Sequence, residues 1–211
     1  KIAKKYSKEA DSINQSRTTN LTDNTVIMVL SETFSDPTRV PGVSFAEDPM
    51  PNIRQIKSET TSGLMLSPGY GGGTANIEYQ ALTGLSMANY SDTLSIAYQQ
   101  LVPGQKWDQS LNQLCNEKNG EDSSVAFHAY NRGMYFRDIN YKKFGFSKFY
   151  ATDGTPKLTD LHPIDSAWYS SDESFYSQVL KQVQSSDSNK FYQVVTIQNH
   201  MPYEEDLYTD N

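Results

Sequence analysis

Two long runs of apolar and β-branched residues constrain the fold of this chain more than any other feature. The first is TVIMVLSE at residues 25–32, and the second is KFYQVVTIQNH at residues 190–200. Nearly continuous apolar runs of this length are typical of strands that are buried on both faces. Helical patterns lie between them, and the alternation of strands with helices predicts an α/β fold with a mostly parallel central sheet flanked by helices.

The pattern predicts several further elements. We expect a helix from 74 to 82, a short strand ending at 128, a short helix and then an aromatic loop over 133–150, and a helix over 170–186. Apolar residues spaced three or four apart from 107 to 115 predict another helix, which ends at Gly120 and buries Cys115. Residues 1–24 read as a polar helix and linker, residues 35–52 as loop, and residues 60–67 as an extended segment.

Composition and charge exclude several classes of protein. The chain has 211 residues, a net charge of −7 and no basic block, so nucleic acid binding has little support. Its single cysteine excludes an internal disulfide. The apolar runs are all shorter than the roughly 20 residues that a membrane-spanning helix needs.

Three polar residues follow predicted strands directly. Glu32 closes the first run, His128 ends the strand at 124–128, and His200 ends the last run. Sites in parallel sheets form where strands end and loops begin, so these side chains are candidates for one site. Glu32 is well placed to hold a divalent cation, and Asp36, four residues later, is a weaker candidate for the same role. The plainer interpretations stay open: Glu32 is a solvated loop acid, and each histidine is structural.

A glycine-rich loop precedes one hydroxyl in GYGGGTANIEYQALTG, residues 69–84. It lacks the lysine of a phosphate-binding P-loop and the serine of a nucleophile elbow. It is therefore a plain turn with a threonine cap, an anion site at a helix start, or a loop that presents Thr74 as a nucleophile. Arg137 suits an oxyanion, or alternatively forms a surface salt bridge.

These segments in this order resemble the lipoteichoic acid synthase family. The segments are NTVIMVLSETFSD, GGGTANIEYQALTG, FHAYNRGMYFRDINYKKFGFSKFY and VVTIQNHMPY, which together extend from residue 24 to residue 203. Members of that family are extracellular phosphoglycerol transferases with a sulfatase/alkaline-phosphatase-like fold. The resemblance implies that residues 25–211 are a catalytic domain of this type whose C-terminal part is missing.

The resemblance also implies a site and a reaction. Glu32 and Thr74 would bind Mn²⁺ or Mg²⁺, and Thr74 would be the nucleophile. Phosphatidylglycerol would donate glycerol phosphate to Thr74, and a glycerol-phosphate polymer would then accept it. The residues that would contact the phosphoglycerol group are Gly72, His128, Tyr135, Arg137 and His200.

The chain departs from the family pattern at several places. Tyr130 and Tyr135 stand where a small acid and a tryptophan are frequent, and the Asp-His pair that completes the family's metal site does not follow His200. We therefore expect the 1–211 chain by itself to bind metal weakly and to turn over little. Family members are anchored by N-terminal membrane helices, which implies the extracellular face of a bacterial, Gram-positive cell membrane.

Two other functions remain open. One is a sulfatase-like phosphodiesterase or hydrolase, although the Cys/Ser-x-Pro-x-Arg motif of sulfatases is absent around Thr74. The other is a binding domain of the cell envelope that keeps the fold without catalysis.

Overall fold

One parallel sheet organises the chain. The structure is a computed structural model that describes residues 1–67, 69 and 73–209. Within this part, four strands pair in the order β1-β4-β2-β3, and all the pairs are parallel. The expected α/β fold with a mostly parallel sheet is confirmed. The strands are β1 Val26–Leu30, β2 Ser124–His128, β3 Lys148–Tyr150 and β4 Phe191–Val195.

The last strand in sequence lies in the middle of the sheet. β4 pairs with β1 from Val26↔Phe191 to Leu30↔Val195, and with β2 from Ser124↔Phe191 to His128↔Val195. The register therefore brings the carboxyl ends of these three strands, at 30, 128 and 195, to the same edge. The segments that follow them meet above this edge.

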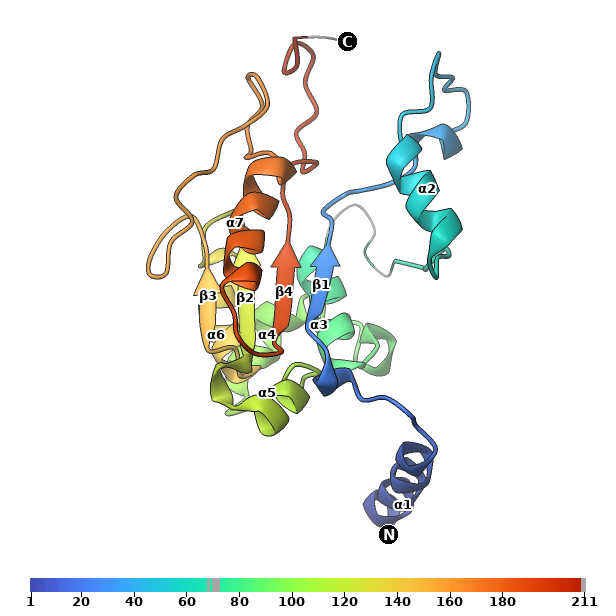
Figure 1. Cartoon of the computed structure of the whole chain (residues 1–211), viewed down its shortest axis with the longest axis vertical. Coiled ribbons are helices and arrows are strands. Elements are labelled where there is room, and N and C mark those ends of the chain that lie inside the picture. The colour runs from blue at the N-terminus through green and yellow to red at the C-terminus, as the bar shows by residue number, and fades with distance from the viewer. Residues whose placement is uncertain (68, 70–72, 210–211) are drawn as a thin grey trace.

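Helices cover both faces of the sheet (Figure 1). α7 lies in front of it, and α3, α4 and α6 lie behind, while α5 lies below the strands, α1 stands apart from the sheet and α2 lies beyond β1. The α-helices are α1 Ile2–Gln15, α2 Pro51–Glu59, α3 Thr74–Thr83, α4 Ala97–Gln100, α5 Gln113–Asn119, α6 Arg137–Lys143 and α7 Asp172–Gln184. Short 3-10 helices cover Leu21–Asp23, Pro37–Arg39, Met87–Asn89, Val102–Gly104, Glu121–Ser123 and Met134–Phe136.

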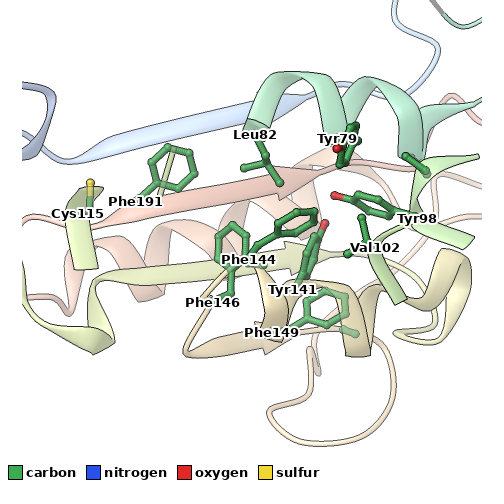
Figure 2. Packing of buried hydrophobic residues seen from close by; sticks show 14 residues of the cluster. Tyr79, Leu82, Tyr98, Val102, Cys115, Tyr141, Phe144, Phe146, Phe149 and Phe191 are labelled. Atoms are coloured by element: carbon green, nitrogen blue, oxygen red, sulfur yellow. The ribbon is translucent and has the colours of Figure 1, made fainter. Parts of the chain in front are cut away.

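Each face of the sheet has its own hydrophobic cluster. The larger cluster joins α3, α4 and α6 to the back of the sheet and is dominated by aromatic rings, as Figure 2 shows. Cys115 belongs to it and is fully buried, as its helical spacing predicts. The second cluster packs Phe175 and Val179 of α7 against Phe127 and Val194 of the sheet.

β1 is less buried than expected. The prediction that this strand is buried on both faces is wrong, because Ile27 and Val29 remain 43% and 45% exposed. Within the described residues β1 pairs with β4 alone, so it forms an edge of the sheet. α7 covers the neighbouring part of this face, where Val194 is fully buried.

Four other local predictions need correction. Pro51 begins α2, a helix that the sequence pattern does not predict, and residues 60–67, predicted to be extended, contain no strand. α5 begins at Gln113, so the helix expected from residue 107 is shorter. The loop expected near residue 148 contains β3.

The other predicted elements are confirmed. They are the helices beginning at 74 and 172, the strand that ends at His128, and the polar N-terminal helix, which buries none of its residues. The described helices include none that is long and apolar enough to span a bilayer.

Candidate active site

A small cavity of about 80 Å³ lies at the carboxyl edge of the sheet. Its walls come from segments that are far apart in the sequence: the end of β1, the start of α3, the end of β2, the start of α6 and the segment after β4. Six predicted site residues line it together, namely Glu32, Thr74, His128, Tyr135, Arg137 and His200. Gly72, the seventh, lies outside the described residues.

Thr74 begins α3 and points at Glu32. Its hydroxyl donates a hydrogen bond of 2.5 Å to Glu32 Oε2, and the α3 N-cap is Gly73, whose φ is +90°. The interpretation of Thr74 as a plain helix cap is therefore wrong, because Gly73 is the N-cap and the Thr74 hydroxyl binds Glu32. The Glu32 backbone N–H donates to Thr196 Oγ1 at 3.1 Å, and this bond joins the segment after β1 to the segment after β4.

His128 is buried and held in one tautomer. Its Nδ1 lies 3.0 Å from the carbonyl oxygen of Val195, which can only accept, so Nδ1 carries the proton. Burial, with a smaller contribution from the positive charge of Arg137, lowers the pKa of His128 to about 3. The ring is therefore neutral near pH 7, and its Nε2 is a hydrogen-bond acceptor.

Arg137 forms a fully buried ion pair with Glu78 (side-chain exposures 1% and 0%). Arg137 Nη2 and Nε donate to Glu78 Oε1 at 2.5 and 3.1 Å. The hydroxyls of Tyr141 and Tyr98 donate to Glu78 Oε2 at 2.7 and 3.4 Å. Arg137 thus makes a salt bridge in the interior, where the plainer interpretation had expected one at the surface.

Glu78 binds Arg137 along one edge of the guanidinium group, so the other N–H groups can still donate hydrogen bonds. Glu78 occupies the Nε and Nη2 edge, and Nη1 makes one long bond of 3.4 Å to the Met134 carbonyl oxygen. A guanidinium has five N–H donors, so the Nη1 and Nη2 edge keeps donor capacity beside the cavity. Such an edge suits a tetrahedral oxyanion.

The turn that leads into α6 is strained. Tyr135 and Phe136 have φ values of +54° and +57°, a region that large L-residues rarely adopt. This conformation holds the ring of Tyr135 5.2 Å from the Arg137 guanidinium, at cation–π distance. Strain of this kind is frequent at functional sites, where the surrounding structure maintains it.

Sequence reasoning missed one residue of this arrangement and overvalued another. Glu78 was not singled out, although it lies four residues after Thr74 and so on the same face of α3. Asp36, the weaker candidate for a metal ligand, lies elsewhere: it binds Arg54 and accepts from the Thr38 backbone N–H.

The described residues supply part of a metal site. The oxygens of Glu32 and Thr74 are hard ligands of the kind that Mg²⁺ and Mn²⁺ prefer, and they already lie together. Across the described ranges, no group of three or more His, Cys, Asp or Glu side chains is arranged to hold an ion.

Comparison with known proteins identifies the family. A family model described as Sulfatase matches residues 24–211. The chain belongs to the sulfatase family. The sulfatase-family chain is 35% identical over 187 residues to a Rhizobium meliloti protein named as a candidate cyclic beta-1,2-glucan modification protein. It is 29% identical over 86 residues to the lipoteichoic acid synthase-like YvgJ of Bacillus subtilis.

Solved structures agree with this family. The sulfatase-family chain matches the Streptococcus pyogenes phosphoglycerol transferase GacH, in complex with sn-glycerol-1-phosphate, with a TM-score of 0.87 and 37% identity. The match covers 97% of this chain and 52% of that chain. The lipoteichoic acid synthase LtaP of Listeria monocytogenes matches with a TM-score of 0.65 at 22% identity over 86% of this chain and 42% of that one, which shows the common fold.

The expected resemblance to sulfatase-like phosphoglycerol transferases is thereby confirmed. The match to GacH covers about half of the GacH chain. The match to the Rhizobium protein covers 88% of this chain but 27% of that protein.

Proposed function

We propose that this chain is the catalytic part of a phosphoglycerol transferase and that Thr74 is its nucleophile. The observation that carries the proposal is the 2.5 Å hydrogen bond from the Thr74 hydroxyl to Glu32, inside a cavity that is also lined by the candidate substrate contacts His128, Tyr135, Arg137 and His200. The likeness to GacH, which binds sn-glycerol-1-phosphate, supports the substrate class. Residues 25–211 form the proposed catalytic domain.

In the first half-reaction, Thr74 Oγ1 forms a bond to the phosphorus of phosphatidylglycerol. The bond from phosphorus to the diacylglycerol oxygen breaks, and the hydroxyl proton, first held toward Glu32, ends on that leaving oxygen. The product is glycerophospho-Thr74. In the second half-reaction an acceptor hydroxyl attacks the same phosphorus, the bond to Thr74 breaks, and the acceptor's proton returns to Thr74 Oγ1.

The surrounding side chains have separate tasks. Arg137 offers its free edge to the phosphoryl oxygens as charge develops on them. His128 is neutral with Nε2 as an acceptor, so it suits a glycerol hydroxyl better than a phosphoryl oxygen. His200 Nδ1 lies 2.6 Å from the Met201 carbonyl oxygen, which leaves its Nε2 for substrate. By the family resemblance, Tyr135 and Gly72 would also contact the phosphoglycerol group.

A divalent cation belongs to this proposal. Glu32 and Thr74 would hold Mn²⁺ or Mg²⁺, which supplies charge that lowers the pKa of a bound hydroxyl and polarises the phosphoryl group. The proposed donor is a membrane lipid, and the likeness to lipoteichoic acid synthases supports the outer face of the cell membrane as the place where the whole protein would work.

Replacing Thr74 with alanine in the natural full-length protein tests the proposal. We expect loss of glycerol phosphate transfer from phosphatidylglycerol by at least a hundredfold, measured as labelled polymer. Thr83→Ala is the matched control, because Thr83 lies on the same helix outside the cavity. Its hydroxyl donates to the Tyr79 carbonyl oxygen at 2.6 Å and accepts from the Leu85 backbone N–H at 3.2 Å, both local contacts. Normal transfer by Thr74→Ala would support a non-catalytic binding domain instead.

The same assay separates transferase from hydrolase. A sulfatase-like hydrolase would release free glycerol phosphate at the same rate with and without an acceptor. A transferase would pass the group to the acceptor, and its turnover would depend on the acceptor concentration.

A further inference from the structure

The turn that follows β1 contains a strained threonine. The Phe34 backbone N–H donates to the Ser31 carbonyl oxygen at 3.3 Å, which closes a four-residue turn with Glu32 and Thr33 at its centre. Thr33 has a φ of +53°. A positive φ at the third residue of a turn usually calls for glycine or asparagine. In a β-branched residue such as threonine this conformation is an outlier.

Packing does not explain the strain at Thr33, because its side chain is exposed. Five non-glycine residues in the described ranges have a positive φ. Two of them are aspartates, which adopt this conformation more readily than most residues. The other three lie in segments that line the small cavity: Thr33, Tyr135 and Phe136. Strain that gains no packing and lies at a candidate site is typical of residues that maintain a functional geometry.

Thr33 and Thr74 bind the two oxygens of one carboxylate. Thr33 Oγ1 donates to Glu32 Oε1 at 3.3 Å, and Thr74 Oγ1 donates to Glu32 Oε2 at 2.5 Å. The main chain of Glu32 is already fixed, since its N–H donates to Thr196 Oγ1 at 3.1 Å. The Thr33 hydroxyl therefore limits the motion that remains, which is rotation of the carboxylate group.

We propose that Thr33 is a positioning residue for the transfer reaction. This inference rests on the proposed function of Thr74 as the nucleophile. The strained turn and the Thr33 hydroxyl together hold Glu32 Oε2 toward the Thr74 hydroxyl before the substrate binds. A geometry that is fixed in advance avoids an entropy cost during the reaction. Thr33 lies outside the described lining of the small cavity, so it acts through Glu32 and not on the substrate.

Transfer kinetics and thermal unfolding of Thr33→Gly in the natural full-length protein test this inference. Glycine relieves the strain, so we expect the unfolding midpoint to rise by about 2–4 °C. Because the hydroxyl is lost, we expect kcat to fall roughly tenfold while KM for phosphatidylglycerol changes by less than about twofold. A merely structural role would not combine greater stability with a lower kcat. An unchanged kcat, a lower unfolding midpoint or an effect on KM alone would overturn the inference.

Three further variants separate the hydroxyl from the strain. Thr33→Ser keeps the hydroxyl and should retain most of the natural kcat. Thr33→Val keeps the branched shape without the hydroxyl, so it should lose kcat as Thr33→Gly does but gain no stability. Asp206→Gly is the matched control, since Asp206 has a φ of +65° and lies outside the described lining of the small cavity. Equal losses of kcat in Thr33→Ser and Thr33→Val, or in Asp206→Gly and Thr33→Gly, would contradict the proposed role.

A double variant tests whether Thr33 acts through Glu32. Glu32→Asp keeps a carboxylate but moves it, so the Thr33 hydroxyl has less to hold in place. We expect the combined loss of kcat in Glu32→Asp with Thr33→Gly to be smaller than the product of the two single losses. A combined loss equal to that product would mean that Thr33 acts independently of Glu32, against the inference.

A last measurement distinguishes this inference from the proposed function. Intact-protein mass spectrometry after incubation with phosphatidylglycerol follows formation of glycerophospho-Thr74, and we expect Thr33→Gly to form it roughly tenfold more slowly. Formation at the natural rate would refute the role of Thr33 and leave the proposed function standing. If the natural protein forms no adduct and Thr74→Ala still transfers, the proposed function fails, and the role of Thr33 fails with it.

Discussion

At the scale of single residues, the pair of Glu78 and Arg137 links the interior to the candidate site. Glu78 lies one turn below Thr74 on α3, and Arg137 begins α6. Two tyrosines that donate to Glu78, Tyr98 and Tyr141, pack edge to face at 6.4 Å in the aromatic cluster (Figure 2). The pair therefore sets the position of the arginine relative to the nucleophile's helix.

Removing one partner of this pair should be costly. We expect Glu78→Gln to lower the free energy of unfolding by about 3–5 kcal/mol, because it leaves the charge of Arg137 buried without compensation. Replacing both residues, as Glu78→Gln with Arg137→Met, should recover part of this loss. Urea unfolding of the two single variants and the double variant measures the coupling, and additive effects would contradict it.

His128 should make stability depend on pH. The unfolded chain takes up its proton near pH 6.5, whereas burial holds the folded-state pKa at about 3. Protons then favour the unfolded state between these values, so this contribution to stability is complete above pH 6.5 and is lost as the pH falls toward 3. Unfolding between pH 7 and pH 4 should show a slope up to about 1.4 kcal/mol per pH unit steeper in the natural protein than in His128→Gln. Equal slopes would contradict this assignment.

At the scale of elements, the start of α3 depends on a glycine. Gly73 has φ +90° and Gly84, at the other end of the same helix, has φ +72°. Among the described residues, an added Cβ at either position meets no atom closer than 3.9 Å, so the cost of an alanine is conformational.

We expect Gly73→Ala and Gly84→Ala each to destabilise the fold by roughly 1–2 kcal/mol. Gly73→Ala alone should also impair transfer, because Gly73 directly precedes Thr74 and a changed backbone conformation there would move the Thr74 hydroxyl. Thermal unfolding and the transfer assay measure the two effects separately. Equal activities in the two variants would show that the N-terminal turn of α3 tolerates displacement.

The sequence predicts the elements whose patterns are local and strong. β2, β4, α3 and α7 combine clear apolar periods with recognisable ends, such as Ser171, which accepts a hydrogen bond from the Ser174 backbone N–H. α2 buries none of its residues, so it lacks the apolar stripe that marks a helix. β3 has three residues, too few to show a strand period.

The residues of the candidate site likewise divide into those that a local sequence pattern predicts and those that it does not. Glu32, His128 and His200 were predictable because strand ends in a parallel sheet converge. The partner of Arg137 was not, since nothing local distinguishes the buried carboxylate of Glu78 from a solvated helix acid. The contact joins α3 to α6 across the fold, and only the tertiary structure reveals it.

At the scale of the whole molecule, the exposed edge strand β1 favours association between copies of the chain. Ile27 and Val29 are half-exposed, and in the part of the chain that the structure describes, one backbone edge of β1 has no strand beside it. Unpaired edges with apolar side chains promote pairing between molecules.

We expect the 1–211 chain to self-associate as its concentration rises and Val29→Lys to reduce this association severalfold. Light scattering after size-exclusion chromatography measures it. Met28→Lys is the control: Met28 packs against the cluster on the opposite face, so this change should destabilise the fold instead. Association that Val29→Lys leaves unchanged would assign the contact to another surface.

The strand order also dictates when the protein can begin to fold during synthesis. β4 separates β1 from β2, yet of the four described strands it is the last to leave the ribosome. Val26 and its partner Phe191 are 165 residues apart, so at 5–20 residues per second β1 would wait about 8–33 seconds for β4. Until β4 is made, the nascent chain lacks the sheet that brings Glu32 and Thr74 together, and we expect its early apolar run to be open to chaperones.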